Sequence, residues 1–434
     1  MLIKYPVHVN YEKFSDDKPS EAKYGLPLDV KFCTRCVESN QRPNTTIEYK
    51  HNKNSKKEAV AFDKNDVCAA CNFSLKKEKT NWDEREIMLR ELCDKHRRSD
   101  GRYDCIVPGS GGKDSIYVSN ILKNEYGMHP LTVTWSPHIY TDWGRKNFDS
   151  WIHGGQDNIL ITPNGKIHRL LTRLAVDVLF HPFQPFIFGQ KSLAPKIAAA
   201  MGIPLVFYGE HEAEYGSEVE NNDASTQDSK FYSNVNFDDM HLSGVPVKQL
   251  IEEFDIDKAE LQPYMPVNRS IIEDSKIQVR YFGYYKKWHP QGAYYYAAEN
   301  TDFSAAPERT VGTYSKYSSI DDKIDDFHYY TTGIKFGRAR ATEDAAQEIR
   351  SGEITREEGV ALVKRYDLEW PERFADEVFK YLSIPEKEFQ TASKQFEQPI
   401  MDRRYFTDLT DSFRSPHIWK WDGKIWKLRN TVWG

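Results

Sequence analysis

Residues 109–115, Gly-Ser-Gly-Gly-Lys-Asp-Ser, constrain the fold of this chain more than any other stretch. They follow the apolar run Ile106-Val107-Pro108 and precede a helix-forming segment, so they predict a strand, a tight loop and a helix in succession. The glycines leave backbone N–H groups accessible to an anion, and the helix directs the positive end of its dipole at the same place. This context argues against the alternative of an ordinary surface turn.

The side chains of this loop are suited to phosphate chemistry. Ser110 and Ser115 can donate hydroxyl hydrogen bonds, Lys113 can neutralise negative charge, and Asp114 can ligate Mg²⁺. The Lys113-Asp114 pair excludes the G-x-x-x-x-G-K-[ST] loop of kinases and GTPases. The stretch instead resembles the S-G-G-x-D-S signature of PP-loop ATP pyrophosphatases. This resemblance implies catalytic roles for Lys113 and Asp114, and a grip on the pyrophosphate of ATP by Ser110, Gly111, Gly112, Lys113, Asp114 and Ser115.

Length and composition set outer limits on the class of protein. A chain of 434 residues suggests two or three domains, and the formal net charge of −6 argues against a general nucleic-acid partner. We find no apolar stretch of membrane-spanning length and no signal-peptide core in residues 1–10. We therefore expect a cytoplasmic protein with no membrane partner.

Short apolar runs alternate with helical patterns after residue 100, which predicts a parallel sheet covered by helices on both faces. Strands are expected at residues 103–107, 131–135, 158–161, 204–208 and 277–285, and helices at residues 113–126, 145–154, 167–180 and 192–201. Ligands of such sheets bind beyond the carboxyl ends of the strands. Residues that directly follow a strand are therefore candidates for the site.

Three carboxylates follow the expected strand at residues 204–208. Glu210 comes directly after it and is a candidate catalytic residue, while Glu212, Glu214 and Tyr215 are candidate substrate contacts. They could ligate Mg²⁺, act as a base or accept hydrogen bonds. The alternative is a solvated helix start, where acidic residues favour the dipole.

Farther along the chain, Trp288 and Gln291 lie among aromatic and basic residues that suit a sugar or nucleotide, or else form an aromatic seam between domains. Residues 221–236 are polar and predict a mobile loop over the substrate. The region after residue 321 is expected to be largely helical, with a helix end, a turn and a capped restart at residues 351–358. Lys335 and Arg338 could reach the triphosphate or lie on the surface.

Four of the six cysteines form two C-x-x-C pairs, Cys33 with Cys36 and Cys68 with Cys71. Paired knuckles at this spacing predict one structural Zn²⁺ in a zinc ribbon. A redox pair or disulfides are the alternatives, but a redox motif needs only one pair and disulfides are rare in the cytosol. Cys93 and Cys105 are expected to be buried small hydrophobes.

Taken together, these motifs resemble the N-acetyl sugar amidotransferases of bacterial surface-polysaccharide (lipopolysaccharide O-antigen) and nonulosonate biosynthesis. The resemblance covers nearly the whole chain: the cysteine pairs and residues 108–115, 140–148, 184–186, 208–216, 335–338 and 351–367. It implies an α/β fold with a parallel-sheet PP-loop domain of the adenine nucleotide alpha hydrolase-like kind at residues 86–290. A zinc ribbon at residues 1–85 precedes it, and a mainly helical region at residues 291–434 completes the substrate site.

The family's chemistry implies a sugar-nucleotide or nonulosonate substrate and the cofactors ATP, Mg²⁺ and Zn²⁺. ATP adenylylates the oxygen of an acetamido group, and ammonia then displaces AMP to leave an acetamidine. Residue 2 is Leu2, and Cys93 and Cys105 lack the small neighbours of a nucleophile elbow, so we expect a separate glutaminase subunit, with or without an ammonia-channelling barrel protein. A zinc-ribbon tRNA thiolation enzyme and a non-enzymatic nucleotide-binding scaffold remain alternatives.

Overall fold

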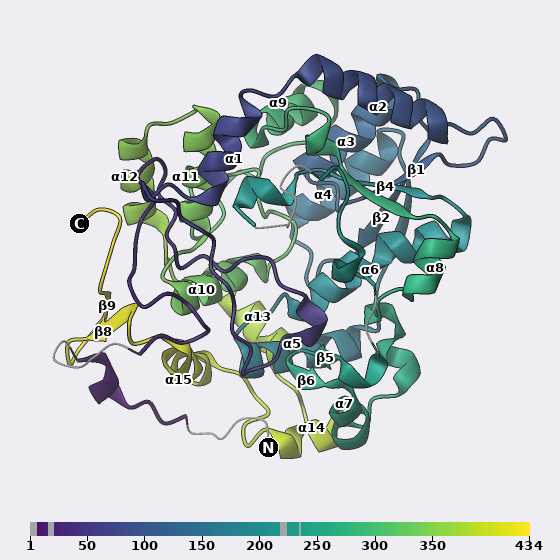
Figure 1. Ribbon diagram of the computed structural model, residues 1–434. Coiled ribbons are helices and arrows are strands. Elements are labelled where there is room, and N and C mark those ends of the chain that lie inside the picture. The colour runs from purple at the N-terminus through teal and green to yellow at the C-terminus, as the bar shows by residue number, and fades with distance from the viewer. Residues whose placement is uncertain (1–6, 16–20, 218–223, 234–235) are drawn as a thin grey trace.

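The computed structural model describes residues 7–15, 21–217, 224–233 and 236–434. Within these ranges, five strands form a parallel sheet in the order β3-β2-β1-β4-β7 (Figure 1). The strands are β1 (Cys105–Pro108), β2 (Pro130–Trp135), β3 (Asp157–Ile161), β4 (Leu205–Tyr208) and β7 (Gln278–Tyr281). The expectation of an α/β fold with a parallel sheet is confirmed.

Alternate residues of the central strands point to opposite sides of the sheet and are apolar on both. Both faces therefore need a cover of helices. Cys105 and Val107 pack with α2 and α3, whereas Ile106 packs with α5 and α6. Figure 1 shows α2 above the sheet and α5 below it. The helices of this region are α2 (Trp82–His96), α3 (Lys113–Asn124), α4 (Asp142–His153), α5 (Gly165–Leu179), α6 (Gln184–Met201), α7 (Val247–Phe254), α8 (Arg269–Asp274) and α9 (Pro290–Asn300).

The direction of strand addition reverses between β1 and β4. From β1 the chain adds β2 and then β3 on one side, and α5 and α6 return it to β4 on the other side of β1. A crevice forms beyond the carboxyl ends of the strands at such a switch point, and ligands of open α/β sheets bind there. The glycine-rich loop follows β1 and Glu210 follows β4, so both lie at this point.

Two elements differ from the expectations by more than three residues. The helix expected at residues 192–201 already begins at Gln184, because Pro185 is well suited to a first helical turn. The strand expected at residues 277–285 ends at Tyr281 and continues as a short 3₁₀ helix, η7 (Phe282–Tyr284). There the N–H of Gly283 donates to the carbonyl of Gly209 at 2.8 Å, which bends the chain over the end of β4.

The loop expected at residues 221–236 falls partly outside the described residues, at positions 221–223 and 234–235. Its described part lies against the sheet, where Thr226 forms a β-bridge with Arg280 of β7. This part contains η4 (Ser229–Phe231). The short elements before and after it in the chain are η3 (Glu212–Tyr215), η5 (Phe237–Asp239), β5 (His241–Leu242), β6 (Val245–Pro246) and η6 (Lys258–Tyr264).

The last third of the described chain is mainly helical, as expected. It contains α10 (Asp325–Phe336), α11 (Arg340–Ser351), α12 (Arg356–Tyr366), α13 (Ala375–Leu382), α14 (Gln390–Gln395), α15 (Arg403–Phe413) and the hairpin of β8 (Trp419–Trp421) and β9 (Trp426–Leu428). The predicted helix restart is confirmed. Gly352 ends α11 in the left-handed conformation, and a capping box between Thr355 and Glu358 begins α12.

The N-terminal segment contains η1 (Tyr11–Phe14), η2 (Glu48–Lys50) and α1 (Ala69–Lys77). Its four paired cysteines share a hydrophobic cluster with Ala345, Ala346 and Val363 of α11 and α12. The first and last parts of the described chain are therefore in direct contact. Among the described helices, none is both long and apolar enough to cross a lipid bilayer.

Candidate functional site

The glycine-rich loop leaves the first turn of α3 accessible. Gly111 adopts φ +81°, and a Cβ atom there would lie 2.8 Å from the Cα of Phe148, so the local backbone requires glycine. Gly112 caps α3 without any side-chain hydrogen bond, and a Cβ added to it would meet nothing closer than Ser110 Oγ at 3.9 Å. Residues 110–114 line a cavity, so the start of α3, whose first amides have no acceptor within the helix, opens onto it as at an anion site.

Asp114 is held by two neighbours. Lys113 Nζ lies 2.6 Å from its Oδ2, and the indole Nε1 of Trp288 donates to its Oδ1 at 3.2 Å. Trp288 is buried and comes from the turn before α9, so a segment distant in the sequence fixes this carboxylate. The contact brings together predicted catalytic and substrate residues.

Glu210 faces the same space from the end of β4. The hydroxyl of Tyr215 donates to its Oε1 at 3.0 Å. Burial, reinforced by the negative charge of Asp114, raises the pKa of Glu210. A carboxylate with a raised pKa can accept a proton at a pH nearer to neutrality, as a general base requires.

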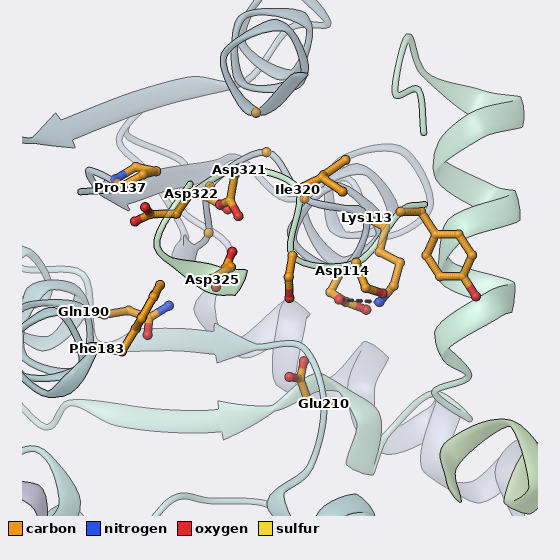
Figure 2. Close-up of a pocket in the computed structure, with 18 of the residues that line it drawn as sticks. Lys113, Asp114, Pro137, Phe183, Gln190, Glu210, Ile320, Asp321, Asp322 and Asp325 are labelled. Atoms are coloured by element: carbon orange, nitrogen blue, oxygen red, sulfur yellow. Dashed lines mark hydrogen bonds and ion pairs between the residues drawn. The ribbon is translucent and has the colours of Figure 1, made fainter. Parts of the chain in front are cut away.

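These residues line one cavity of about 400 Å³, which is the size of a small-molecule site (Figure 2). The loop, Glu210, Tyr215 and Trp288 form one wall. An apolar wall comes from β2 and α6, and includes Val133, Trp135, Phe183, Phe186, Ile187 and Leu193. One region of the cavity is therefore apolar, and another is polar.

The third wall was missed by the sequence predictions. It consists of residues 315–322, the start of α10 and one face of α11, and its charged members are Asp321, Asp322, Asp325, Arg340, Glu343, Asp344 and Glu348. Asp322 has a structural role, because its carboxylate accepts hydrogen bonds from the backbone N–H and the Nδ1 of His138 at 2.6 and 2.7 Å. The hydroxyl of Ser110 lies close to the carboxyl of Asp321 and partly opposes the rise in its pKa that burial causes, so this wall adjoins the glycine-rich loop.

Several predicted residues do not line the cavity, and each has another partner. Ser115 Oγ donates to Gly112 O, Glu212 accepts from Gln227, Glu214 pairs with Lys77, and Gln291 donates to Tyr295. Lys335 donates to Leu179 O at 2.8 Å, and Arg338 pairs with Glu38 at 2.8 Å. The structure thus directs Lys335 and Arg338 away from the loop, while Arg340 is the basic residue of this segment that lines the cavity.

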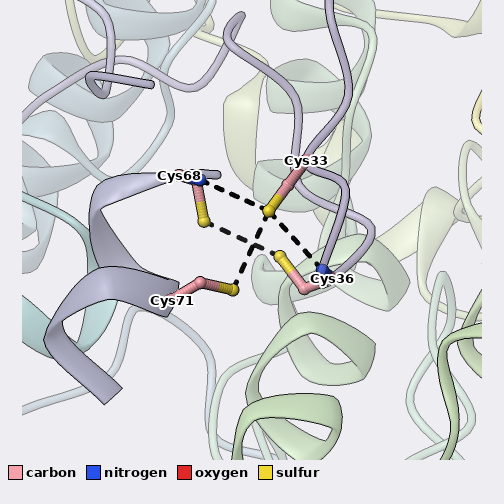
Figure 3. A group of neighbouring side chains, drawn as sticks. All are labelled: Cys33, Cys36, Cys68 and Cys71. Carbon is pink, nitrogen blue, oxygen red and sulfur yellow. Dashed lines mark hydrogen bonds between the residues drawn. The ribbon is translucent and has the colours of Figure 1, made fainter. Parts of the chain in front are cut away.

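The two C-x-x-C pairs meet in a second candidate site (Figure 3). The Sγ atoms of Cys33, Cys36, Cys68 and Cys71 lie within 4.8 Å of one another, and all four residues are buried. Backbone amides of residues 35, 36 and 68 donate to Cys33 Sγ at 3.3–3.5 Å, which favours the thiolate form that binds metals. The cluster can therefore hold a metal ion such as zinc in tetrahedral coordination.

The two remaining cysteines are fully buried in the core, as expected. Burial raises the pKa of Cys93 to about 12 and that of Cys105 well above its ordinary value. A nucleophilic cysteine needs a lowered pKa and access to its substrate. Neither Cys93 nor Cys105 has these properties.

Comparison with known proteins connects the last third of the chain to polysaccharide biosynthesis. Residues 311–432 match the family model described as LPS biosynthesis protein WbpG-like, C-terminal domain. The chain is also 28% identical over 77 residues to an uncharacterized protein of Methanocaldococcus jannaschii, which covers 18% of this chain and 27% of that protein. The chain thus spans about a quarter of that relative's length. The family match indicates an enzyme with a role in polysaccharide biosynthesis.

Proposed function

We propose that this chain is an ATP-dependent amidotransferase that converts the N-acetyl group of a surface-polysaccharide sugar to an acetamidino group. One observation carries the proposal. Residues 315–348, which lie within the WbpG-like region, form a wall of the same cavity that the glycine-rich loop and Glu210 line. A phosphate-binding geometry and a region typical of polysaccharide biosynthesis thus share one site.

The loop suits ATP as the first substrate. Its backbone amides and the start of α3 would hold the departing pyrophosphate, and Lys113 would neutralise part of its charge. The apolar wall of β2 and α6 would accommodate the adenine ring. Asp114 supplies an oxygen ligand of the kind that Mg²⁺ prefers, and the ion would stabilise negative charge on the phosphates.

The proposed reaction has two steps. The acetamido oxygen attacks the α-phosphorus of ATP, pyrophosphate leaves, and Glu210 takes the proton that the amide nitrogen loses. Ammonia then attacks the imidate carbon, a C–N bond forms, and the C–O bond breaks with its electron pair leaving on AMP. An amide oxygen is a poor leaving group, whereas AMP is a good one, so adenylylation makes the second step possible.

Ammonia is proposed to come from a separate glutaminase, with or without a barrel protein that channels it. The four paired cysteines form the metal-type cluster, and the other two are buried with raised pKa values, so no cysteine of the chain is placed to attack glutamine. The same observation disfavours tRNA thiolation, which needs cysteines that carry sulfur. We assign the cluster a structural Zn²⁺ with no open coordination position.

Incubation of the purified chain with MgATP, ammonium chloride and a panel of sugars tests the proposal. The panel holds a CMP-nonulosonate, a nonulosonate precursor and a UDP-linked diacetamido sugar. We expect AMP, pyrophosphate and an acetamidine-bearing sugar by mass spectrometry, with ammonium but not with glutamine, and Glu210→Gln should impair the ammonium reaction. Formation of ADP and phosphate, or of thiolated tRNA, would contradict the proposal.

A further inference from the structure

Asp325 stands apart from the other carboxylates of the cavity. Eight acidic side chains line the cavity among the described residues, and six have a hydrogen-bond or ion-pair partner. These are Asp114 with Lys113, Glu210 with Tyr215, Asp322 with His138, Glu343 with Arg338, Asp344 with Arg340, and Glu348 with Tyr314. Asp321 has the hydroxyl of Ser110 nearby. Within the described chain, the carboxylate of Asp325 has no hydrogen bond or ion pair.

This unpartnered carboxylate is also buried. Asp325 is only 7% exposed, and Figure 2 shows it projecting into the cavity toward Asp321. A buried charge without a partner carries a high desolvation cost, so such a group is retained where a ligand satisfies it. The position therefore calls for a ligand that is a cation or a strong hydrogen-bond donor.

The charges around Asp325 favour a cation. Asp321, Asp322 and Asp326 lie close enough to raise its pKa, together with its burial, and Arg340 is the only cation that opposes them among its main neighbours. Asp326 and Arg340 are already paired with Arg373 and Asp344. A neutral hydroxyl would leave this excess of negative charge uncompensated, whereas a small cation would offset it.

The proposed reaction needs a second proton acceptor. Ammonium predominates over ammonia at neutral pH and must lose a proton before its nitrogen can attack the imidate carbon. Glu210 has by then accepted the proton of the amide nitrogen. A raised pKa suits Asp325 to accept this second proton.

We propose that Asp325, backed by Asp321, is the ammonium-binding site of this enzyme and the base that converts ammonium to the attacking ammonia. In this step one N–H bond breaks, its electron pair stays on nitrogen, and the proton moves to an oxygen of Asp325. Addition of ammonia to the imidate carbon and departure of AMP give an amidinium cation whose three N–H hydrogens all come from ammonia. The proton on Asp325 therefore passes to water, which restores the carboxylate. This inference rests on the proposed amidotransferase function.

The test uses the full chain and a sugar that the wild-type protein converts with ammonium chloride. Asp325→Asn should lower kcat/KM for ammonium by about 100-fold, the order of magnitude of a general base, and leave ATP–pyrophosphate exchange within about twofold of wild type. Hydroxylamine is largely unprotonated at neutral pH and needs no base, so it should be used equally well by both proteins. Asp302→Asn, which removes an exposed carboxylate, is the matched control.

The outcomes separate this inference from the function on which it rests. An unchanged kcat/KM for ammonium, an equal loss with hydroxylamine, or an altered Mg²⁺ dependence of exchange in Asp325→Asn would overturn the role of Asp325. A wild-type protein that shows neither exchange nor acetamidine formation would instead contradict the amidotransferase proposal. Removal of an unpartnered buried charge should not unfold the chain, and Asp325→Ser provides a second variant with the same expected pattern.

Discussion

The cysteine cluster and the cavity differ in how the chain encodes them. Each C-x-x-C pair sets two ligands by local spacing, and only one long-range contact is needed to bring four Sγ atoms within 4.8 Å. The cavity collects residues from the loop after β1, from β4, from α6, from the turn before α9 and from α10 and α11. A site whose ligands are set by local spacing can be predicted from the sequence. A site formed by distant segments can be predicted only in part.

Loss of a cysteine ligand should have the largest effect on stability. Cys68→Ser should abolish binding of the metal ion and lower the free energy of unfolding by several kcal/mol, up to about 10 kcal/mol. Metal analysis and thermal unfolding measure both effects. Cys93→Ser is the matched control, because Cys93 is buried outside the cluster and should keep one zinc per chain. Full metal content in Cys68→Ser would show that the cluster is not a four-ligand site.

Loss of the loop carboxylate should have the largest effect on chemistry. Asp114→Asn should reduce pyrophosphate release by about 100-fold or more, because contacts made mainly in the transition state are lost. The unfolding temperature should stay close to that of wild type, as for Asp149→Asn on the exposed side of α4. If Asp114→Asn released pyrophosphate near the wild-type rate, the loop would have no role in the reaction.

A third variant tests the connection between the two regions. Lys77, the last residue of α1, donates to Glu214 Oε1 at 2.5 Å and to the carbonyl of Trp288 at 2.9 Å. Lys77→Met should cost about 3–5 kcal/mol of stability, since it leaves the buried carboxylate of Glu214 without its partner. Denaturant unfolding of this variant is compared with that of Lys76→Met, which changes an exposed lysine of the same helix. A combined Lys77→Met and Glu214→Gln variant should recover part of the loss.

The smallest expected effect concerns the two adjacent glycines of the loop. Gly112 has φ −76° and room for a Cβ atom, so Gly112→Ala should fold normally but raise KM for ATP about tenfold by crowding the start of α3. Gly111→Ala should instead lower stability, because φ +81° and the nearby Phe148 backbone exclude a side chain. Equal KM values for ATP in wild type and Gly112→Ala would show that the phosphates of ATP do not bind at the start of α3.

Local patterns explain which parts were predictable from the sequence. The strands, the glycine-rich loop, Glu210 after β4 and the cysteine pairs follow from short apolar runs and from the rule that ligands bind beyond strand ends. Asp321 and Asp325 could not be found in this way. Asp321 lies in an irregular segment whose path is set by tertiary contacts, such as its approach to Gly144, where a Cβ atom would lie 2.3 Å from the Asp321 Cα. Asp325 is the first residue of α10, where an acidic residue by itself suggests only a favourable helix start.

Lys335 and Arg338 illustrate the opposite case. From the sequence they could reach the triphosphate or lie on the surface, but both are buried and have partners, Lys335 with Leu179 O and Arg338 with Glu38. A cluster of basic residues in sequence does not reveal the buried acceptors that surround it in the fold. Arg340, two residues later, reaches the cavity because it lies at the start of α11.

Transfer of oxygen from the sugar to AMP tests the central claim most directly. An acceptor sugar carrying ¹⁸O in its acetamido group is incubated with the chain, MgATP and ammonium chloride. The masses of the products are then measured by mass spectrometry. Adenylylation of the acetamido oxygen predicts one ¹⁸O atom in AMP and none in pyrophosphate, with an acetamidine that has lost the label. Recovery of the label in inorganic phosphate with ADP, or its retention in the sugar, would contradict the account.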